Sequence, residues 1–269
     1  MYFCDMQIFT ITTDFGADNH AVSSVKGRIF SATTDCQVVD LSHTASKFNL
    51  QQAAYIFKST YLNFPEGTVH FIFNNLHENK NQQLIYVFEN GHHIFCPDNG
   101  FITLLFHDQP VQIYRLTDKL NSYNFVAVTD LFLANVALMN HGQEMDVEIT
   151  SVDSILVKKP HVAFYQNNIL DAQVLHIDYF GNVVLNVTKE YFEECRQGRN
   201  VKIHFMRHEE ITQIHAHYND VDASFPVCLF NTANHLEIAI NQGNAAQLFG
   251  FSESTDRSLF YNSIKIFFE

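Results

Sequence analysis

Basic residues are scarce in this chain. Its 269 residues contain 16 Lys and Arg against 29 Asp and Glu, which gives a net charge of −13 at pH 7. A surface with this excess of negative charge repels the phosphate backbone that a nucleic-acid-binding protein must neutralise. We therefore expect no nucleic acid among its partners.

Cysteines and long apolar runs are also lacking. The five cysteines are odd in number, widely spread and without a Cys-x-x-Cys pair, which argues against a disulfide framework or a structural zinc site. No apolar run approaches the ~20 residues needed to cross a bilayer, and residues 1–13 carry no basic leader before an apolar stretch. We expect a cytoplasmic protein with no membrane partner.

Several familiar site motifs are absent. Neither Gly-x-Gly-x-x-Gly nor Gly-x-x-x-x-Gly-Lys-Ser/Thr occurs, so the usual cradles for dinucleotides and nucleoside triphosphates are missing. There is no Gly-x-Ser-x-Gly nucleophile motif. Four of the fifteen histidines lie close together in sequence, but their spacing follows no known zinc pattern, and we expect no metal. The four are His204, His208, His215 and His217.

The residues that are present predict two domains. Up to about residue 159, alternating or apolar strand-like segments (7–13, 37–41, 68–73) are interleaved with helical ones (19–31, 50–62), which is typical of a layered α/β sheet. Asn90-Gly91 separates two further strand-like runs and predicts a hairpin. A third helix is expected over 130–141.

After about residue 159 short alternating runs dominate, and they predict an all-β domain. The runs are 174–177, 183–187, 201–205, 227–230 and 236–240. We expect a mostly parallel α/β domain at residues 1–162 and a barrel-like β domain at residues 168–269, with the boundary near 160–168. At this length, two modest domains are a reasonable size.

Two turns carry candidate ligand groups. Asp14 follows the first strand, and ligands of open α/β sheets bind outside the carboxyl ends of the strands; the alternative is an ordinary turn or helix-cap Asp. Asp178-Tyr179-Phe180-Gly181-Asn182 interrupts a pair of apolar strands, where a structural hairpin turn is the alternative to a ligand site.

Six segments in this order resemble the S-adenosylmethionine (SAM) hydroxide adenosyltransferases and the related SAM-dependent fluorinases and chlorinases. The segments are TTDFG (12–16), VDLSH (39–43), FPEGTVH (64–70), PDNG (97–100), DYFGN (178–182) and LEIAINQGNAA (236–246). The resemblance spans nearly the whole chain. It implies an α/β domain followed by a β-barrel, and a homotrimer whose ligand sites lie between the first domain of one subunit and the second domain of its neighbour.

The resemblance also implies ligand contacts, and the residue types present at these positions suit them. Asp14 matches the acceptor of the ribose diol, for which two carboxylate oxygens are well matched. Aromatic rings remain at the ribose and adenine positions, and Asn182 and Asp178 match the groups that hold the adenine edge and the methionine ammonium. The remaining positions are Phe48 against the ribose, Tyr218 on adenine, Ala245 beside the adenine edge, and Thr232 and Ala233 near the methionine carboxylate, where the halogenases carry an Arg.

The reactive half departs from the family pattern. In the hydrolytic members an Asp-Pro-Gly-Val-Gly loop followed by Arg, and a Phe-His-Gly-Arg-Asp segment, surround the attacking water. Here residues 74–82 read NNLHENKNQ and residues 125–130 read FVAVTD. Asn75, Gln82 and Ala127 therefore stand where Asp, Arg and His are expected, with Val126 at the His position in a shifted register.

Loss of a general base typically slows a reaction by about 10²–10⁴-fold. The sequence therefore predicts a SAM hydrolase homologue that binds SAM or adenosine and in which hydrolysis to adenosine and methionine is weak or lost. His77 and Glu78 are candidate replacement groups, and the alternative is that both are solvated loop residues. Glu78 would repel a halide, which disfavours halogenation.

Two other functions are also compatible with some of these residues. A non-catalytic trimer that senses or sequesters the nucleoside would use every binding residue named above. Metal-assisted phosphoryl chemistry at Asp14 and Asp98 is a third possibility, motivated only by two acidic turn residues.

Overall fold

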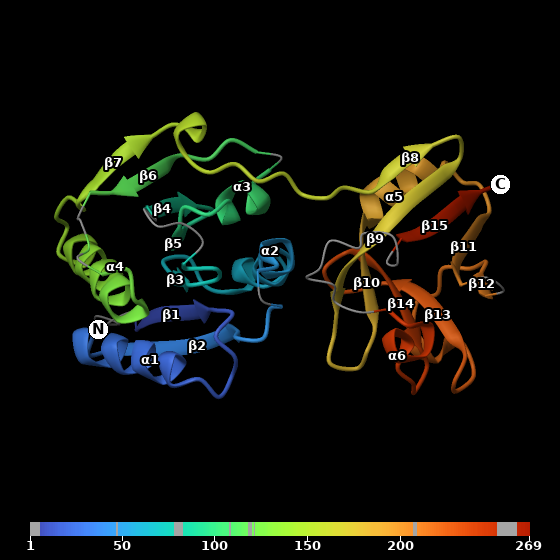
Figure 1. Ribbon diagram of the computed structural model, residues 1–269, viewed down its shortest axis with the longest axis horizontal. Coiled ribbons are helices and arrows are strands. Elements are labelled where there is room, and N and C mark those ends of the chain that lie inside the picture. The colour runs from blue at the N-terminus through green and yellow to red at the C-terminus, as the bar shows by residue number, and fades with distance from the viewer. Residues whose placement is uncertain are drawn as a thin grey trace, which may run out of the picture. The chain divides into compact units, whose positions relative to one another are not determined.

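A computed structural model describes residues 6–46, 48–77, 83–107, 109–117, 120, 122–206, 209–251 and 263–269 (Figure 1). The chain divides into two compact units, Met1–Pro160 and His161–Glu269. Each has its own hydrophobic core.

The first unit is built on a mixed sheet of seven strands in the order β2-β1-β3-β5-β4-β6-β7. Its four neighbouring strands β2, β1, β3 and β5 run parallel to one another. The remaining pairings, β5 with β4, β4 with β6 and β6 with β7, are antiparallel. The parallel strands end at one edge, which is where ligand sites form in such sheets. The strands are β1 Gln7–Thr12, β2 Cys36–Ser42, β3 Val69–Ile72, β4 Leu84–Glu89, β5 His92–Pro97, β6 Ile113–Leu116 and β7 Val147–Thr150.

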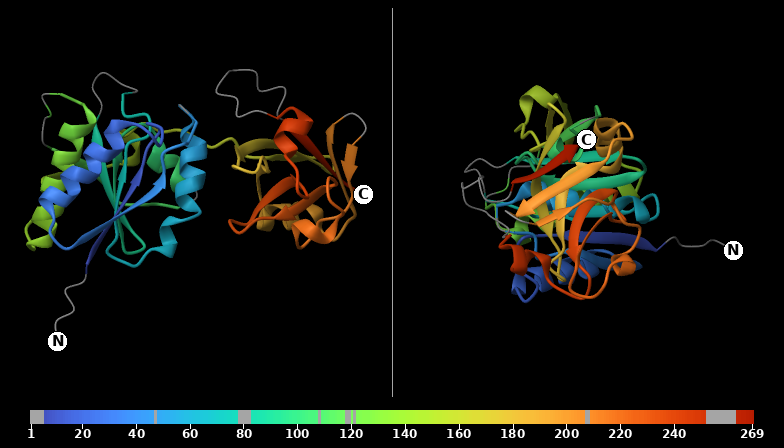
Figure 2. Two further views of the ribbon diagram at one scale, coloured as in Figure 1. Left: turned by 90° about the horizontal axis from the view of Figure 1, so that it is seen from below. Right: turned by 90° about the vertical axis from the view of Figure 1, so that its right-hand side faces the viewer.

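Two pairs of helices cover the two faces of this sheet, as the left view of Figure 2 shows. Helices α1 (His20–Ala32) and α4 (Phe125–Asn140) cover one face, over a core rich in phenylalanine that includes Phe71, Phe95 and Phe132. Helices α2 (Leu50–Lys58) and α3 (Phe101–Leu105) cover the other. The expected layered α/β architecture is confirmed.

Capping residues explain where the helices begin. The side chain of Asn19 accepts a hydrogen bond from the backbone N–H of Ala21, and that of Asn49 accepts one from Gln52, so the predicted starts of α1 and α2 are confirmed. Helix α2 ends at Lys58, and residues 61–62 of the predicted helix belong instead to a 3₁₀ turn, Tyr61–Asn63.

Helix α4 begins five residues earlier than predicted. The side chain of Asn124 accepts hydrogen bonds from the backbone N–H groups of Val126 and Ala127 and so caps the helix. The sequence pattern also missed α3, β6 and β7, which are only four or five residues long. A second 3₁₀ turn, Val152–Ser154, precedes the end of the unit.

Buried histidines form a hydrogen-bonded chain inside the first unit. Thr10 Oγ1 lies 2.6 Å from His70 Nδ1, and His70 Nε2 lies 3.0 Å from His92 Nδ1. Burial disfavours the charged imidazolium and, with the neighbouring histidines, lowers the pKa of His70 to about 3. Burial likewise lowers the pKa of His93 to about 4 and lowers the pKa of His92.

We expect these buried histidines to lower the stability of the folded protein in acid. An unfolded histidine takes up a proton below about pH 6.5, whereas folded His70 stays neutral until about pH 3. The contribution of neutral His70 to the free energy of unfolding is therefore fully present above pH 6.5. It is lost as the pH falls towards 3, by up to roughly 1.4 kcal/mol per pH unit. Urea unfolding at several pH values measures this slope.

The matched variants are His70→Gln, which removes the buried titrating group, and His141→Gln, which changes an exposed histidine just after α4. The first should flatten the dependence of the unfolding free energy on pH and the second should leave it unchanged. Equal slopes in all three proteins would contradict the prediction.

The second unit is an antiparallel sheet in the order β12-β11-β15-β9-β10-β14-β13, with β8 paired to β9. Its two outermost strands, β12 and β13, lie in contact, so the sheet is nearly closed into a barrel, as expected. The strands are β8 Phe164–Gln166, β9 Ile169–Ile177, β10 Val183–Thr188, β11 Val201–Met206, β12 Glu209–Ile211, β13 Pro226–Phe230, β14 His235–Ile240 and β15 Ser263–Phe268.

The alternating pattern did not predict strands β8, β12 and β15 of this unit, nor three of its short non-strand elements. These three are the helices α5 (Lys189–Arg196) and α6 (Ala245–Phe249) and a 3₁₀ turn, Tyr218–Asp220. Across the segments that the structure describes, no helix combines the length and the apolarity that crossing a membrane requires.

Candidate functional site

Asp14 lies at the carboxyl edge of the parallel strands, two residues after β1 ends. Its Oδ2 accepts a hydrogen bond of 2.9 Å from the backbone N–H of Asn75, which follows β3. The preceding residue, Thr13, joins the same edge to the end of β2, because its Oγ1 lies 2.9 Å from His43 Nδ1. The carboxylate is thus held on one side by the loop after β3.

Asn75 is fixed in turn by the loop after β5. Buried Asn99 donates through Nδ2 to the carbonyl oxygens of Asn74 (2.8 Å) and Asn75 (3.3 Å). Asn75 has a left-handed backbone with φ of +52°, a conformation that Asn and Asp adopt more readily than most residues. Asn75, which the resemblance places at the Asp position of the hydrolytic members, therefore lies beside Asp14.

Contacts between phenylalanine rings join the residue after Asp14 to the start of α4. The ring of Phe15 lies 6.1 Å from Phe73 and 5.9 Å from Phe125, between ring centroids. Phe125 is the first residue of α4, and Ala127 is in the same helical turn. The positions of Asp14, Asn75 and Ala127 are therefore brought to one edge of the sheet.

Two of the other predicted residues of the first unit, His77 and Phe48, are exposed. Glu78 and Gln82 lie outside the described residues. Phe48 has φ of +65° and is 76% exposed, directly before the Asn49 cap of α2. None of the contacts found within the described part of the chain joins Phe48 to Asp14.

In the second unit, Asp178 and Asn182 close the turn between β9 and β10. Asp178 Oδ1 accepts from the backbone N–H of Asn182 (2.8 Å), and Oδ2 accepts from Asn182 Nδ2 (3.0 Å). Tyr179 and Phe180, at the tip, are exposed. Asn182 is therefore oriented by the carboxylate that the resemblance places near the methionine ammonium.

Gly181 joins this turn to α6. Its carbonyl oxygen accepts a 2.9 Å hydrogen bond from the backbone N–H of Ala246, next to buried Ala245. Gly181 has φ of +83°, and a Cβ atom here would lie 2.2 Å from the side chain of Asn244. Only glycine permits this approach, which places Ala245 beside the hairpin turn.

Glu237 links the remaining predicted residues, and sequence reasoning missed it. Its Oε1 accepts from the hydroxyl of Tyr218 (2.7 Å) and its Oε2 accepts from Asn231 Nδ2 (3.1 Å). Asn231 begins the turn that carries exposed Thr232 and also Ala233. The available signal was a single carboxylate inside the apolar run of residues 236–240, since a charged residue is seldom buried unless it is paired.

The carboxyl group of Glu237 lies in a partly apolar setting. Its side chain is buried on β14. Burial raises the pKa of Glu237, and Asp178 raises it further, while the hydrogen bonds from Tyr218 and Asn231 counteract part of the shift. Glu237 is therefore close enough to Asp178 for the two carboxylates to interact.

The comparisons with known proteins decide the family. The models of the N-terminal and C-terminal domains of SAM hydroxide adenosyltransferases match residues 9–148 and 172–257. The chain belongs to the SAM hydroxide adenosyltransferase family. Among curated proteins, the (R)-S-adenosyl-L-methionine hydrolase of Methanocaldococcus jannaschii is 24% identical over 267 residues, covering 90% of this chain and 92% of that protein.

Two solved structures share the fold of this adenosyltransferase-family chain. An uncharacterized conserved protein from Thermotoga maritima superposes with a TM-score of 0.79 at 23% identity, covering 97% of this chain and 99% of its own. A conserved hypothetical protein from Thermus thermophilus gives a TM-score of 0.71 at 20% identity, with 98% and 100% covered. Both span the two units.

The described side chains of this family member offer no metal site. No group of three or more His, Cys, Asp or Glu residues able to hold an ion is found among them. Asp98, the partner of Asp14 in the phosphoryl-transfer alternative, is buried and accepts a 2.8 Å hydrogen bond from the backbone N–H of Leu156. That alternative receives no support from this geometry.

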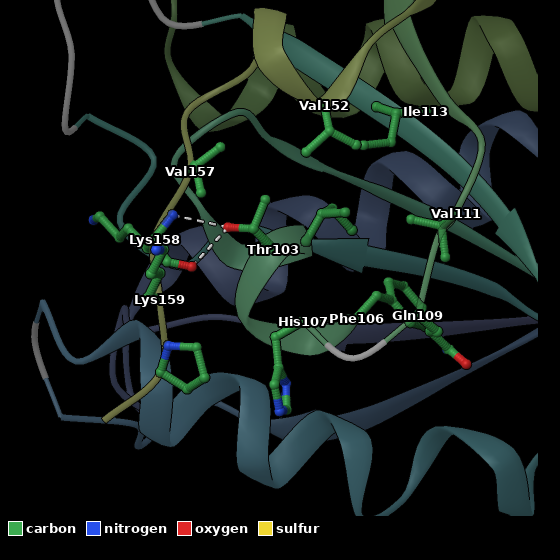
Figure 3. A pocket seen from close by; sticks show the side chains of 12 residues that line it. Thr103, Phe106, His107, Gln109, Val111, Ile113, Val152, Val157, Lys158 and Lys159 are labelled. Carbon is green, nitrogen blue, oxygen red and sulfur yellow. Dashed lines mark hydrogen bonds between the residues drawn. The ribbon is translucent and has the colours of Figure 1, made fainter. Parts of the chain in front are cut away.

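A cavity of about 250 Å³ in this family member lies between α3 and the segment at the end of the first unit (Figure 3). Its lining is largely apolar, with Phe106 and Val157 on two sides. Thr103 exchanges hydrogen bonds of 2.9 and 3.0 Å with the backbone of Lys158 and so closes one wall. Asp14 and Asn75 do not line it, so it is separate from the candidate site.

Proposed function

We propose that this protein binds SAM or adenosine as a homotrimer and that its hydrolysis of SAM to adenosine and methionine is weak or lost. In this proposal Asp14 and Phe48 of one subunit hold the ribose, and the second unit of a neighbouring subunit holds the adenine and methionine ends. Membership of the SAM hydroxide adenosyltransferase family supports a SAM-derived ligand.

The observation that carries the proposal is the contrast between the two halves of the candidate site. The binding residues are held in place: Asp14 by Asn75, Asn182 by Asp178, and Tyr218 by Glu237. At the three positions that resemble the hydrolytic centre, the sequence places Asn75, Gln82 and Ala127. None of these side chains can act as a general base near neutral pH.

The expected rate follows from the chemistry of the substrate. The sulfonium of SAM is already a good leaving group, so displacement at the ribose C5′ chiefly requires an aligned and partly desolvated nucleophile. A water molecule without a base still attacks, about 10²–10⁴-fold more slowly. His77 is a candidate replacement base, and equal adenosine release by the wild type and His77→Ala would dismiss it.

A non-catalytic role in sensing or sequestering the nucleoside is the second candidate. It is favoured by the absence of a titrating group at Asn75 and at Ala127, which lies in the first turn of α4. It shares every binding residue with the first candidate, so only turnover separates the two.

The test is to incubate the purified protein with SAM and to follow thermal stability and adenosine formation together. Stabilisation with slow adenosine release supports a weak hydrolase, and stabilisation without product supports the binding role. If neither SAM nor adenosine raises the melting temperature, the proposed function is wrong. Sedimentation of the same samples determines whether the assembly is a trimer.

A further inference from the structure

We infer that Glu237 is a positioning residue: its buried carboxylate fixes the ring of Tyr218 in one orientation for a planar nucleoside base, and it fixes the turn at Asn231 for the methionine end of the ligand. This inference rests on the proposed function, because it concerns how the second unit holds the same ligand.

Tyr218 has the features of a stacking platform. The residue is 43% exposed, while its hydroxyl donates to Glu237 Oε1 at 2.7 Å. The 3₁₀ turn that carries it is itself fixed, because Asp220 Oδ2 accepts from the backbone N–H groups of Ala216 (2.9 Å) and His217 (3.0 Å). A ring anchored at its hydroxyl and at its backbone keeps one orientation, so little conformational entropy is lost when a flat base stacks on it.

Asn231 carries the second branch of the arrangement. Its Nδ2 donates to Glu237 Oε2, and its Oδ1 accepts from the backbone N–H groups of Ala233 (3.0 Å) and His235 (3.1 Å). The amide is thereby fixed in one orientation, with its donor towards the carboxylate and its acceptor towards the turn. Glu237 therefore also holds the backbone around Thr232.

A carboxylate suits both branches better than any neutral side chain. The side chains of Tyr218 and Asn231 both donate to it, and a carboxylate has only acceptors, so each oxygen meets a donor. A glutamine has one acceptor oxygen and one donor –NH₂ group, so its –NH₂ would face Tyr218 or Asn231 and one of the two hydrogen bonds would be lost. The burial of an ionisable group at this point is thus explained by the groups that it orients.

The test compares Glu237→Gln, Tyr218→Phe and the double variant, with adenosine binding measured by calorimetry below the melting temperature of each protein. Tyr218→Phe keeps the ring and removes only its hydroxyl. We expect each single variant to weaken adenosine binding by about 3- to 10-fold, as expected for one side chain released from its bound orientation. The double variant should bind adenosine as tightly as the single variant with the lower affinity, because both changes act on the same hydrogen bond between Tyr218 and Glu237.

Tyr165→Phe is the matched control. The Tyr165 hydroxyl also takes part in hydrogen bonds within the second unit, with Asn168 and Arg199, and it does not contact Glu237. This variant should change the melting temperature without changing adenosine affinity, which separates a loss of stability from a loss of positioning.

The outcomes distinguish this inference from the function on which it rests. If wild-type protein binds adenosine and both Tyr218→Phe and Glu237→Gln bind it equally well, the role of Glu237 is overturned and the proposed function stands. Additive losses in the double variant also overturn it. If wild-type protein binds neither adenosine nor SAM, the proposed function fails and this role fails with it.

Discussion

Replacing Asp14 with alanine should weaken adenosine binding by about 100-fold or more. In the proposed site both ribose hydroxyls donate to its carboxylate, and hydrogen bonds to a charged group contribute about 1.5–3 kcal/mol each. Removal of two such bonds corresponds to at least a 100-fold loss, since about 1.4 kcal/mol is a factor of ten. Calorimetric titration with adenosine measures the effect.

Two further variants make this result interpretable. Asp14→Asn retains an oxygen that accepts the backbone N–H of Asn75, so it tests the charge while preserving the loop. Its loss should be smaller than that of alanine. Asp18→Ala removes an exposed carboxylate from the same turn and should leave affinity unchanged. If Asp14→Ala binds adenosine as the wild type does, Asp14 is only a turn residue.

Restoring the family's hydrolytic groups should accelerate adenosine release. The triple variant Asn75→Asp, Gln82→Arg and Ala127→His returns the three side chains that surround water in the hydrolytic members, and a recovered general base raises the rate by about 10²–10⁴-fold. The backbone permits two of these changes. Asp tolerates the positive φ of residue 75, and residue 127 lies in a helical turn capped by Asn124, whose side chain is unaltered.

Adenosine formation from saturating SAM, followed by chromatography, is the measurement. His77→Ala in the otherwise native chain is the control: if it reduces adenosine release, His77 already supplies the base and the gain from the triple variant should be smaller. A triple variant that binds SAM normally but gains no activity would contradict the assignment of these three positions to the reacting centre.

Local signals in the sequence were sufficient for much of the fold. The predicted starts of α1 and α2 fall at Asn19 and Asn49, and in the structure each of these Asn side chains caps its own helix. Asn90-Gly91 marked the β4–β5 hairpin, and both residues have the positive φ that such turns require. Helix α3 and strand β6 were missed because segments of five and four residues contain too few positions to show a period.

The candidate site was only partly visible in the sequence. The resemblance identified Asp14, Asn182 and Tyr218 as single positions, but it said nothing of what holds them. The backbone N–H that supports Asp14 comes from a residue 61 positions away, and the carboxylate that anchors Tyr218 is 19 positions away. Partners at such separations leave no periodic or spacing signal in the chain.

By itself, the sequence determined the layered α/β and barrel-like β architecture and the family resemblance, and it led to the prediction that Asn75, Gln82 and Ala127 stand in place of the hydrolytic side chains. These follow from local pattern and residue identity, which do not depend on long-range contacts. Only the tertiary structure decided that Asn75 lies against Asp14, that Ala127 is inside a helix, and that Glu237 joins Tyr218 to Asn231. The physical reason is that a buried polar group must find its partners wherever folding brings donors and acceptors together.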